Sequence, residues 1–344
     1  MAEFEIKDGV GIIPEGTTKL GWSAFEKCTE LTSVVIPDSV TEIGQSAFLR
    51  CPSLKSVVIG KSVKEIGFNA FKDCTSLTSI VLPDSVSEIG SGIFWGCTNL
   101  KSVVIGNSLK EINSSAFSGC TALTDVTISD SVTSICEHAF ENCTALTGIT
   151  LPNSVNKIEN FAFQKCTSLT SIILPAALDT IGRYTFDQCE ALCNVQLSDN
   201  VTTIRDHAFN NCKSLTRIII PNSVTEIEEN AFADSGLTEV TIPESVKKLG
   251  EFAFMLCDNL KSLTILCPIT VKYIFWNNSS SLETVTLGAG IKKIDERNFD
   301  DSVKVINVPA KKTEYYKKRL SEKYHALIVE QSLDTIMLII NKKP

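Results

Sequence analysis

The stretches AFEKCTEL (24–31), AFLRCPSL (47–54) and AFKDCTSL (70–77) decide the fold, because the same pattern returns every 23 residues. Each places a cysteine three residues after the phenylalanine and a leucine three residues after the cysteine. The leucine marks twelve copies, at Leu31, Leu54, Leu77, Leu100, Leu123, Leu146, Leu169, Leu192, Leu215, Leu237, Leu260 and Leu282. A period in the twenties indicates one supersecondary unit, here called a coil, stacked on itself. The repeat overrides the two or three domains that 344 residues would otherwise suggest.

Each coil contains a pattern typical of a short strand. In LTSVVIPDSVTEIGQSAFLRC (31–51), Val34 and Ile36 alternate with outward-facing residues, the period-two pattern of a strand with one buried face. Pro37 ends this strand, because proline cannot donate the next ladder hydrogen bond. The segment SAFLRC (46–51) is too short for an independent helix. We expect it to form one helical turn on the opposite side of the coil.

The full pattern resembles a known repeat family. L-x-x-V-x-I-P followed by x-x-V-x-x-I-G-x-x-A-F-x-x-C resembles the BspA-like, or Treponema-type, leucine-rich repeat over residues 11–309. The resemblance implies an α/β right-handed solenoid, with a parallel sheet on the concave face and short helical turns opposite. Parallel strands about 4.8 Å apart would give a sheet of roughly 55–65 Å over about 12 to 14 coils.

The ends of the chain are predicted to cap the solenoid, whose terminal coils need a polar outer cover. We expect an N-terminal cap at 1–10, the leucine-rich repeat solenoid at 11–310, and a helix and strand cap at 311–344. The C-terminal segment spaces three apolar residues at i, i+4 and i+8, one face of an amphipathic helix: Tyr316, Leu320 and Tyr324. SLDTIMLII (332–340) is predicted to close the end as a strand.

Ten of the 13 cysteines occupy the same place in the coil: Cys28, Cys51, Cys74, Cys97, Cys120, Cys143, Cys166, Cys189, Cys212 and Cys257. Neighbours in this ladder would lie about 5 Å apart, within disulfide reach by distance alone. Small buried thiols, inter-coil disulfides and metal or redox chemistry are the three alternatives, although no CxxC pair supports a metal site. Ser235 stands in the same place, which favours packing. We expect the ladder thiols to be buried and reduced. Three cysteines lie off the ladder: Cys136, Cys193 and Cys267. Cys193 is expected to be partly exposed, and we make no prediction for the other two.

Composition excludes several partners. The net charge is −8, the pI is near 5.1 and no Lys/Arg cluster precedes residue 311, so we expect no nucleic-acid partner and no binding to anionic membranes. No apolar run reaches about 18 residues, so we expect no transmembrane segment. The N-terminus does not match a secretory signal. A monomer is expected.

The sequence gives little support to catalysis. His138 and His207 share one coil position but lie three coils apart, roughly 14 Å, too far to share a metal ion. Phe161 and Tyr184 stand between them, so a His-Phe-Tyr-His stack is expected, either structural or a candidate aromatic platform for a ligand. No phosphate loop or G-x-S-x-G motif occurs, and the repeated acidic residues have no partner base. We predict no enzyme activity, no cofactor and no metal.

The outward-facing strand positions contain the candidate binding residues. Four consecutive coils place valine there, flanked by two lysines, which gives the set Val35, Val58, Val81, Val104, Lys55 and Lys101. Valine is a good strand former, and this alone could explain the row. An exposed apolar strip on a rigid sheet is also typical of a protein-binding patch. The same columns contain no aromatic residue that could stack on a sugar.

These observations favour a non-catalytic protein-binding or adhesion scaffold that acts through the concave sheet. The family resemblance implies a cell-surface or secreted protein that attaches to host or partner proteins, host extracellular matrix among them. One alternative is an intracellular, cytoplasmic scaffold or effector, where the many cysteines would stay reduced. Another is the repeat portion of a larger protein whose active domain is absent.

Overall fold

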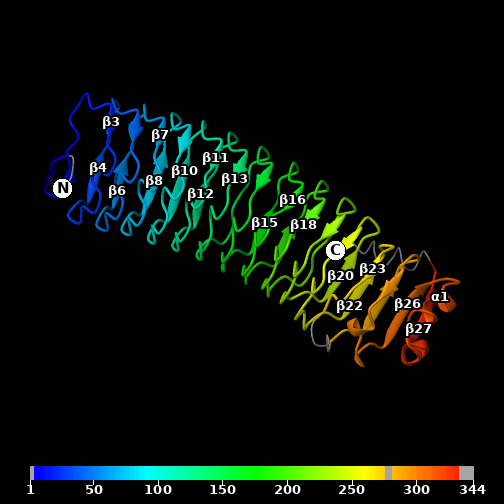
Figure 1. The fold of residues 1–344 in the computed structure, drawn as a ribbon. Coiled ribbons are helices and arrows are strands. Elements are labelled where there is room, and N and C mark those ends of the chain that lie inside the picture. Colours follow the sequence, from blue (N-terminus) through cyan, green and yellow to red (C-terminus); the bar gives the residue numbers. More distant parts are fainter. Residues whose placement is uncertain (1–3, 276–280, 333–344) are drawn as a thin grey trace. The chain divides into compact units, whose positions relative to one another are not determined.

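The computed structural model describes residues 4–275 and 281–332. The chain forms a parallel-sheet solenoid of about 14 turns with a spacing of about 23 residues, which confirms the predicted fold class. It divides into two compact units: unit 1 is Met1–Leu178 with Thr185–Glu190, and unit 2 is Asp179–Tyr184 with Ala191–Pro344. Within each unit, successive coils follow one another in sequence order (Figure 1).

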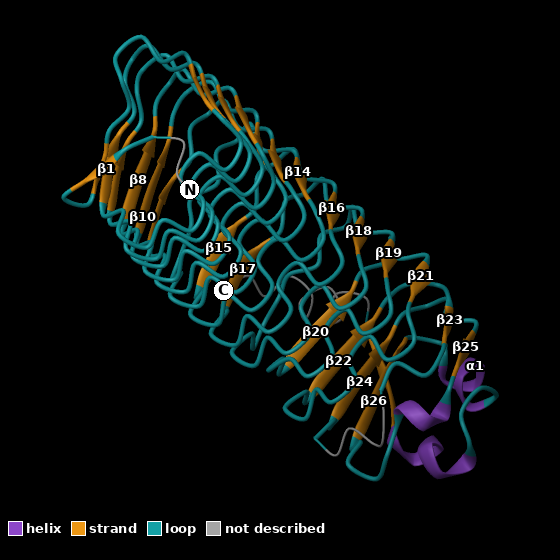
Figure 2. Ribbon diagram, turned by 60° about the vertical axis from the view of Figure 1, so that its left-hand side comes forward, coloured by secondary structure: helices purple, strands orange, loops and turns teal. Residues whose placement is uncertain are grey.

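Most coils of unit 1 contribute two short strands, which lie on two different sides of the coil (Figure 2). The first strands are β2 (Val10–Gly11), β4 (Ser33–Val35), β6 (Ser56–Val58), β8 (Ser79–Leu82), β10 (Ser102–Ile105), β12 (Asp125–Thr127) and β15 (Ser171–Ile173). The second strands are β3 (Lys19–Leu20), β5 (Glu42–Ile43), β7 (Glu65–Ile66), β9 (Glu88–Ile89), β11 (Glu111–Ile112), β13 (Ser134–Ile135) and β14 (Lys157–Ile158). The second strands were not predicted from the sequence.

Register follows directly from the repeat. Equivalent residues pair with no slip, as in Val34↔Val57 between β4 and β6. The expected alternation is present, since Val34 is 1% exposed whereas Val35 is 60% exposed. A one-residue slip would move every buried residue to the solvent face, and the shared core therefore fixes the register.

The predicted helical turn is wrong. Residues 45–50 form consecutive tight turns, in which Ser46 and Arg50 have φ of 56°. The backbone amides donate alternately within the coil and to the next coil. Ala47 N donates to the Gly44 carbonyl of its own coil at 3.2 Å, whereas Phe48 N donates to the Ala70 carbonyl of the next coil at 2.7 Å. A helix would keep these hydrogen bonds within the segment. The coils are therefore joined by backbone hydrogen bonds on this side as well.

The core of unit 1 is a column of stacked phenylalanine rings. All are 0% exposed from Phe25 to Phe163, and neighbouring rings are nearly parallel. Phe48 and Phe71, for example, have centroids 5.0 Å apart and an interplanar angle of 3°. At the start of the chain, β1 (Ile6–Lys7) pairs antiparallel with β2, and Phe4 stacks on Phe25 at 5.7 Å. The N-terminal segment thus extends the sheet and the ring column by one step.

Unit 2 repeats this arrangement. Its first strands are β17 (Asn194–Gln196), β20 (Glu239–Ile242), β22 (Ser262–Ile265), β24 (Thr284–Leu287), β26 (Val305–Pro309) and β27 (Ile328–Gln331). Its second strands are β16 (Thr180–Ile181), β18 (Thr203–Ile204), β19 (Glu226–Ile227), β21 (Lys248–Leu249), β23 (Thr270–Val271) and β25 (Lys293–Ile294). Strands β20, β22, β24, β26 and β27 form one five-stranded sheet.

The C-terminal cap differs from the single amphipathic helix that was predicted. It consists of a short helix α1 (Thr313–Lys317), a 3-10 helix η2 (Glu322–Leu327) and then β27, which pairs parallel with β26. The three residues at helical spacing are buried as expected: Tyr316, Leu320 and Tyr324. Beyond Ser332, the predicted closing strand lies outside the described residues.

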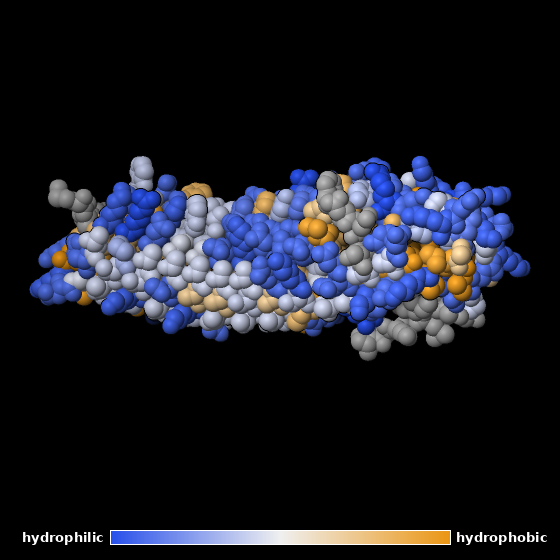
Figure 3. All heavy atoms as spheres, turned by 90° about the horizontal axis from the view of Figure 1, so that it is seen from below, coloured by the Kyte–Doolittle hydropathy of each residue, from blue (hydrophilic) through white to orange (hydrophobic). Residues whose placement is uncertain are grey.

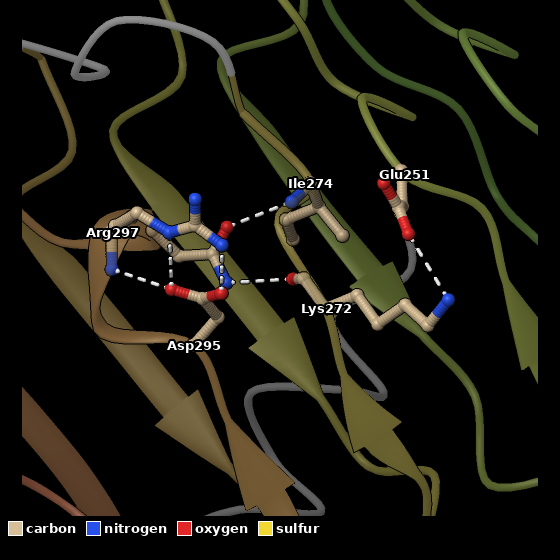
Figure 4. Close-up of polar contacts among 6 residues, drawn as sticks. Glu251, Lys272, Ile274, Asp295 and Arg297 are labelled. Carbon is tan, nitrogen blue, oxygen red and sulfur yellow. Dashed lines mark hydrogen bonds and ion pairs between the residues drawn. The ribbon is translucent and has the colours of Figure 1, made fainter.

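One coil of unit 2 replaces the usual alanine with a buried asparagine. Asn298, at the end of the 3-10 helix η1 (Glu296–Asn298), accepts a hydrogen bond from Ile274 N at 2.8 Å and donates one to the Lys272 carbonyl at 2.8 Å. Figure 4 shows these contacts beside Asp295, which faces Arg297. The amide side chain thus joins two coils where the sequence departs from the repeat.

Candidate protein-binding surface

Four exposed valines form a row on the first sheets of unit 1, here called the valine strip: Val35, Val58, Val81 and Val104. They lie on β4, β6, β8 and β10 and are 60%, 57%, 58% and 42% exposed. Val35 pairs with Val58 and Val81 pairs with Val104 in the sheet register. The row therefore runs across the strands, with one side chain per coil.

Polar columns border the valine strip. Lys55 and Lys101 precede their strands, are exposed, and form no ion pair among the described residues. Two aspartates follow the strands: Asp38 pairs with Lys61 at 3.6 Å, and Asp84 accepts a hydrogen bond from Asn107 N at 2.9 Å. The strip thus has a basic border where strands begin and a partly neutralised acidic border where they end.

The surface seen in Figure 3 is mixed. Hydrophilic and near-neutral residues surround separate patches of hydrophobic ones. Single exposed apolar residues are normal on a protein surface, whereas a contiguous row is not. The valine strip is such a row, whereas Ile173 and Ile219, which are 68% and 62% exposed, have threonine or glutamine at the same position in the coils before and after.

The residues of the candidate aromatic platform form stacked pairs. In unit 1, His138 and Phe161 have centroids 4.6 Å apart and an angle of 8°. In unit 2, Tyr184 and His207 have centroids 4.5 Å apart and an angle of 11°. Phe161 belongs to unit 1 and Tyr184 to unit 2. Because the rings of each pair face each other, each covers one face of its neighbour.

The backbone at these four positions is unusual. Their φ values lie between 54° and 60°, in the left-handed region that bulky side chains seldom adopt. His138 N donates to the Asn160 carbonyl of the next coil at 3.2 Å, and this inter-coil bond helps to hold the conformation. The sequence contained a signal for it, because Asn69 and Gly92 occupy the same coil position in earlier coils.

The cysteine ladder is buried, as predicted. All ten ladder cysteines are buried, and the 13 cysteines, all within the described residues, form no disulfide. The thiol of Cys97 donates to the Phe71 carbonyl at 3.1 Å, and equivalent bonds of 2.9 to 3.2 Å recur along the ladder. Burial raises the pKa of the Cys97 thiol to about 12. The Cys97 thiol is therefore a protonated packing group at neutral pH. The redox state of the ladder stays a prediction.

The cysteines off the ladder divide in two. Cys193 is exposed, as predicted, whereas Cys136 and Cys267 are buried. No group of three or more His, Cys, Asp or Glu side chains that could hold a metal ion occurs among residues 4–275 and 281–332. At Ser235, the hydroxyl lies 3.3 Å from the Cys257 thiol and fills the ladder position.

Each unit also has an open hollow along its second sheet, which sequence reasoning missed. The hollow in unit 1 has a volume of about 550 Å³ and is lined by Glu65, Gly67, Phe68 and Glu88 among others; that in unit 2 has about 730 Å³. Glycine forms the floor because a Cβ on Gly67 would approach the backbone of the preceding coil to 2.5 Å. The repeated I-G dipeptide was the available signal.

The stacked coils, the parallel strands in register and the buried leucine and phenylalanine columns define a leucine-rich repeat solenoid. The chain belongs to the BspA type leucine-rich repeat family, whose profile matches six copies over residues 11–124, 110–235 and 179–307. This family was predicted from the repeat pattern. No match was found among curated proteins.

Several solved structures are similar. A leucine-rich cell surface protein from Faecalibacterium prausnitzii is 29% identical, with a TM-score of 0.52, over 87% of this chain and 85% of that chain. The pneumococcal vaccine antigen PcpA is 20% identical, with a TM-score of 0.53, over 92% and 83%, and supports the fold alone. A Treponema pallidum leucine-rich repeat protein is 29% identical over 53% and 77%, with a TM-score of 0.41. Within the part of this chain that the structure describes, no helix has the length and apolar character to cross a membrane.

Proposed function

We propose that this protein is a non-catalytic protein-binding scaffold of the cell surface or secreted class, and that its contact surface is the valine strip. The observation that carries the proposal is the row of four valines that are 42 to 60% exposed on consecutive coils. Membership of the BspA type family and the likeness to a leucine-rich cell surface protein support it.

The strip suits a protein partner for physical reasons. Its strands are held by paired backbones and a buried core, so binding would order little of the scaffold and cost little conformational entropy. Removing exposed valine side chains from water would contribute about 25 cal/mol per Å² of apolar area. The polar columns on both sides would form the rim that such interfaces have. We propose host extracellular matrix proteins as the partners, in line with an adhesion role.

Binding to a panel of immobilised matrix proteins tests this proposal. The wild-type chain is compared with the variant Val35→Thr/Val58→Thr/Val81→Thr/Val104→Thr, because threonine keeps the strand propensity while removing apolar surface. The matched control is Ile173→Thr/Ile219→Thr, which makes the same kind of change at exposed positions outside the strip.

Saturable matrix binding that is lost in the valine variant and kept in the isoleucine control supports the proposal. Equal binding by all three proteins would refute the strip as the contact surface. Binding to cytosolic proteins alone would favour an intracellular scaffold instead.

A further inference from the structure

We propose that the valine strip receives an amphipathic α-helix of the partner, which lies across the strands along the row of valines with acidic side chains toward Lys55 and Lys101. This inference rests on the proposed function, because it names the partner for the same surface. Three observations favour a helical partner: the spacing of the coils, the backbone pairing of the strands under the strip, and the charges of the residues that border it.

The first argument is the match of two periods. Parallel strands lie about 4.8 Å apart, and the ring column beneath the strip advances by 5.0 to 5.5 Å per coil from Phe25 to Phe117. An α-helix advances about 5.4 Å per turn. One apolar side chain per turn, at i, i+4, i+7 and i+11, can therefore meet one valine per coil over all four coils.

An extended partner fits less well. Alternate side chains of a strand are about 6.6 Å apart, so a strand laid along the row would be out of step by about 5 Å after three coils. Strand addition finds no free edge at β4 or β10, because β4 already pairs with β2 and β6, and β10 already pairs with β8 and β12. Strands β6 and β8 end their ladders, but they contact each other as neighbours in consecutive coils. An added strand needs an unpaired and uncovered backbone edge.

The charged residues beside the valine strip determine which side chains are favoured on the two flanks of the partner helix. Lys55 and Lys101 lie two coils apart on one border, about 10 Å, and two helical turns span about 11 Å. Acidic residues seven apart on one helix flank would therefore meet both lysines. On the opposite border, Asp38 is paired with Lys61 and Asp84 is hydrogen bonded to Asn107, so that side favours neutral or basic residues.

Three 15-residue peptides of matched length and apolar content provide the probe. The first has leucine at i, i+4, i+7 and i+11, glutamate on one flank, and a side-chain cross-link on its outer face that enforces the helix. The second places the leucines at alternate positions without the cross-link. The third replaces the flanking glutamates of the first with lysine. Each is fluorescently labelled, and its Kd for the full chain is measured by anisotropy.

The first peptide is expected to bind at least tenfold more tightly than the other two and to lose binding to the four-valine variant. Lys55→Glu/Lys101→Glu should reverse the preference, so that the lysine-flanked peptide binds more tightly. The matched control is Lys64→Glu/Lys110→Glu, an exposed pair with the same sequence separation beside the second strands, which should leave all three affinities unchanged.

Equal binding by the three peptides, or no binding by the first, would overturn the helical partner. Matrix binding by the wild-type chain and by the four-valine variant distinguishes failure of the helical-partner proposal from failure of the proposed function. If matrix binding still depends on the four valines, the strip is a contact surface whose partner is not such a helix. If matrix binding is also independent of the valines, both proposals fail.

Discussion

Buried thiols make the stability of this protein sensitive to alkaline pH. Cys97 is buried in the core beside the Phe71 carbonyl, and burial raises its pKa from the ordinary value of 9.0 to about 12. Between these values the unfolded chain releases a proton that the folded chain keeps, so the free energy of unfolding falls as pH rises. Below pH 9 both states hold the proton, and the contribution is unchanged.

We expect Cys97→Ala to weaken this dependence. The wild-type free energy of unfolding should fall between pH 8 and pH 10 by about 1.4 kcal/mol more than that of the variant, the linkage for one thiol. Urea unfolding at the two pH values measures the difference. Cys193→Ala, which removes an exposed thiol, should keep the wild-type dependence, and equal pH slopes for all three proteins would contradict the argument.

Thiol labelling tests the burial of the ladder directly. In the native protein, a small thiol reagent should modify Cys193 and leave the ladder cysteines unmodified, because only Cys193 is exposed among the 13. After denaturation all should react if the ladder is reduced. Mass spectrometry counts the modified sites in each state. Rapid native labelling of ladder cysteines would show that the ladder opens, and missing thiols after denaturation would show inter-coil disulfides.

At the residue scale, the repeat alone predicted which side chains face inward. Register fixes the column of each residue, so the exposure of Val35 and the burial of Val34 followed from alternation. The conformation of Phe161 did not, because phenylalanine by itself gives no reason for φ of 60°. Equivalent positions in other coils hold this conformation with an inter-coil hydrogen bond, as from His138 N to the Asn160 carbonyl.

At the scale of elements, the phenylalanine column should contribute most to the stability of unit 1. Phe71 is fully buried between Phe48 and Phe94, with centroids 5.0 and 5.4 Å away. Phe71→Ala should therefore lower the free energy of unfolding by about 3 to 5 kcal/mol. Phe68→Ala, at a residue that is 55% exposed in the same coil, should change it by less than about 0.5 kcal/mol. Chemical denaturation of both variants checks the contrast.

The asparagine bridge in unit 2 leads to a second prediction. Asn298→Ala would leave Ile274 N and the Lys272 carbonyl without their present partners, at a cost of about 1 to 3 kcal/mol for each group that stays buried. Asn298→Asp keeps an acceptor for Ile274 N but sets a buried carboxylate oxygen against the Lys272 carbonyl, so it should also destabilise the protein. Asp295→Ala removes an ion pair with the exposed Arg297 and the N-cap hydrogen bond from Arg297 N, and should cost about 1 kcal/mol. A cost for Asn298→Ala no greater than that for Asp295→Ala would contradict the bridge.

Elements were harder to predict than positions. The second strands, such as Glu42–Ile43, contain two residues each, too few to show a period in the sequence. The short segment 46–51 was predicted to form one helical turn, but half of its amides bond to the next coil. Both errors concern bonds between coils, which a single repeat does not reveal. The valine strip could be predicted because it depends on register alone.

At the scale of the whole molecule, the free energy of unfolding should be a sum of the stabilities of the coils and of the interfaces between neighbouring coils. Arg50 N bonds to the Lys72 carbonyl of the next coil, and ring stacking also joins each coil to its immediate neighbours. Such repeat proteins lose structure locally, because a damaged coil weakens its neighbours more than distant coils.

Native-state hydrogen exchange on the Phe71→Ala variant tests this behaviour. A loss of about 3 kcal/mol in the neighbouring steps corresponds to roughly 100-fold faster exchange of the Ser46 and Phe48 amides, which bond to the coil that contains Phe71. Amides of β24 in unit 2 should keep their wild-type rates within about twofold. Their exchange depends on local opening of their own coil and its neighbours, which do not contact the substituted coil. Phe68→Ala is the control and should change neither set. A uniform acceleration across both units would show that the chain opens as one cooperative body, and the nearest-neighbour description would then be wrong.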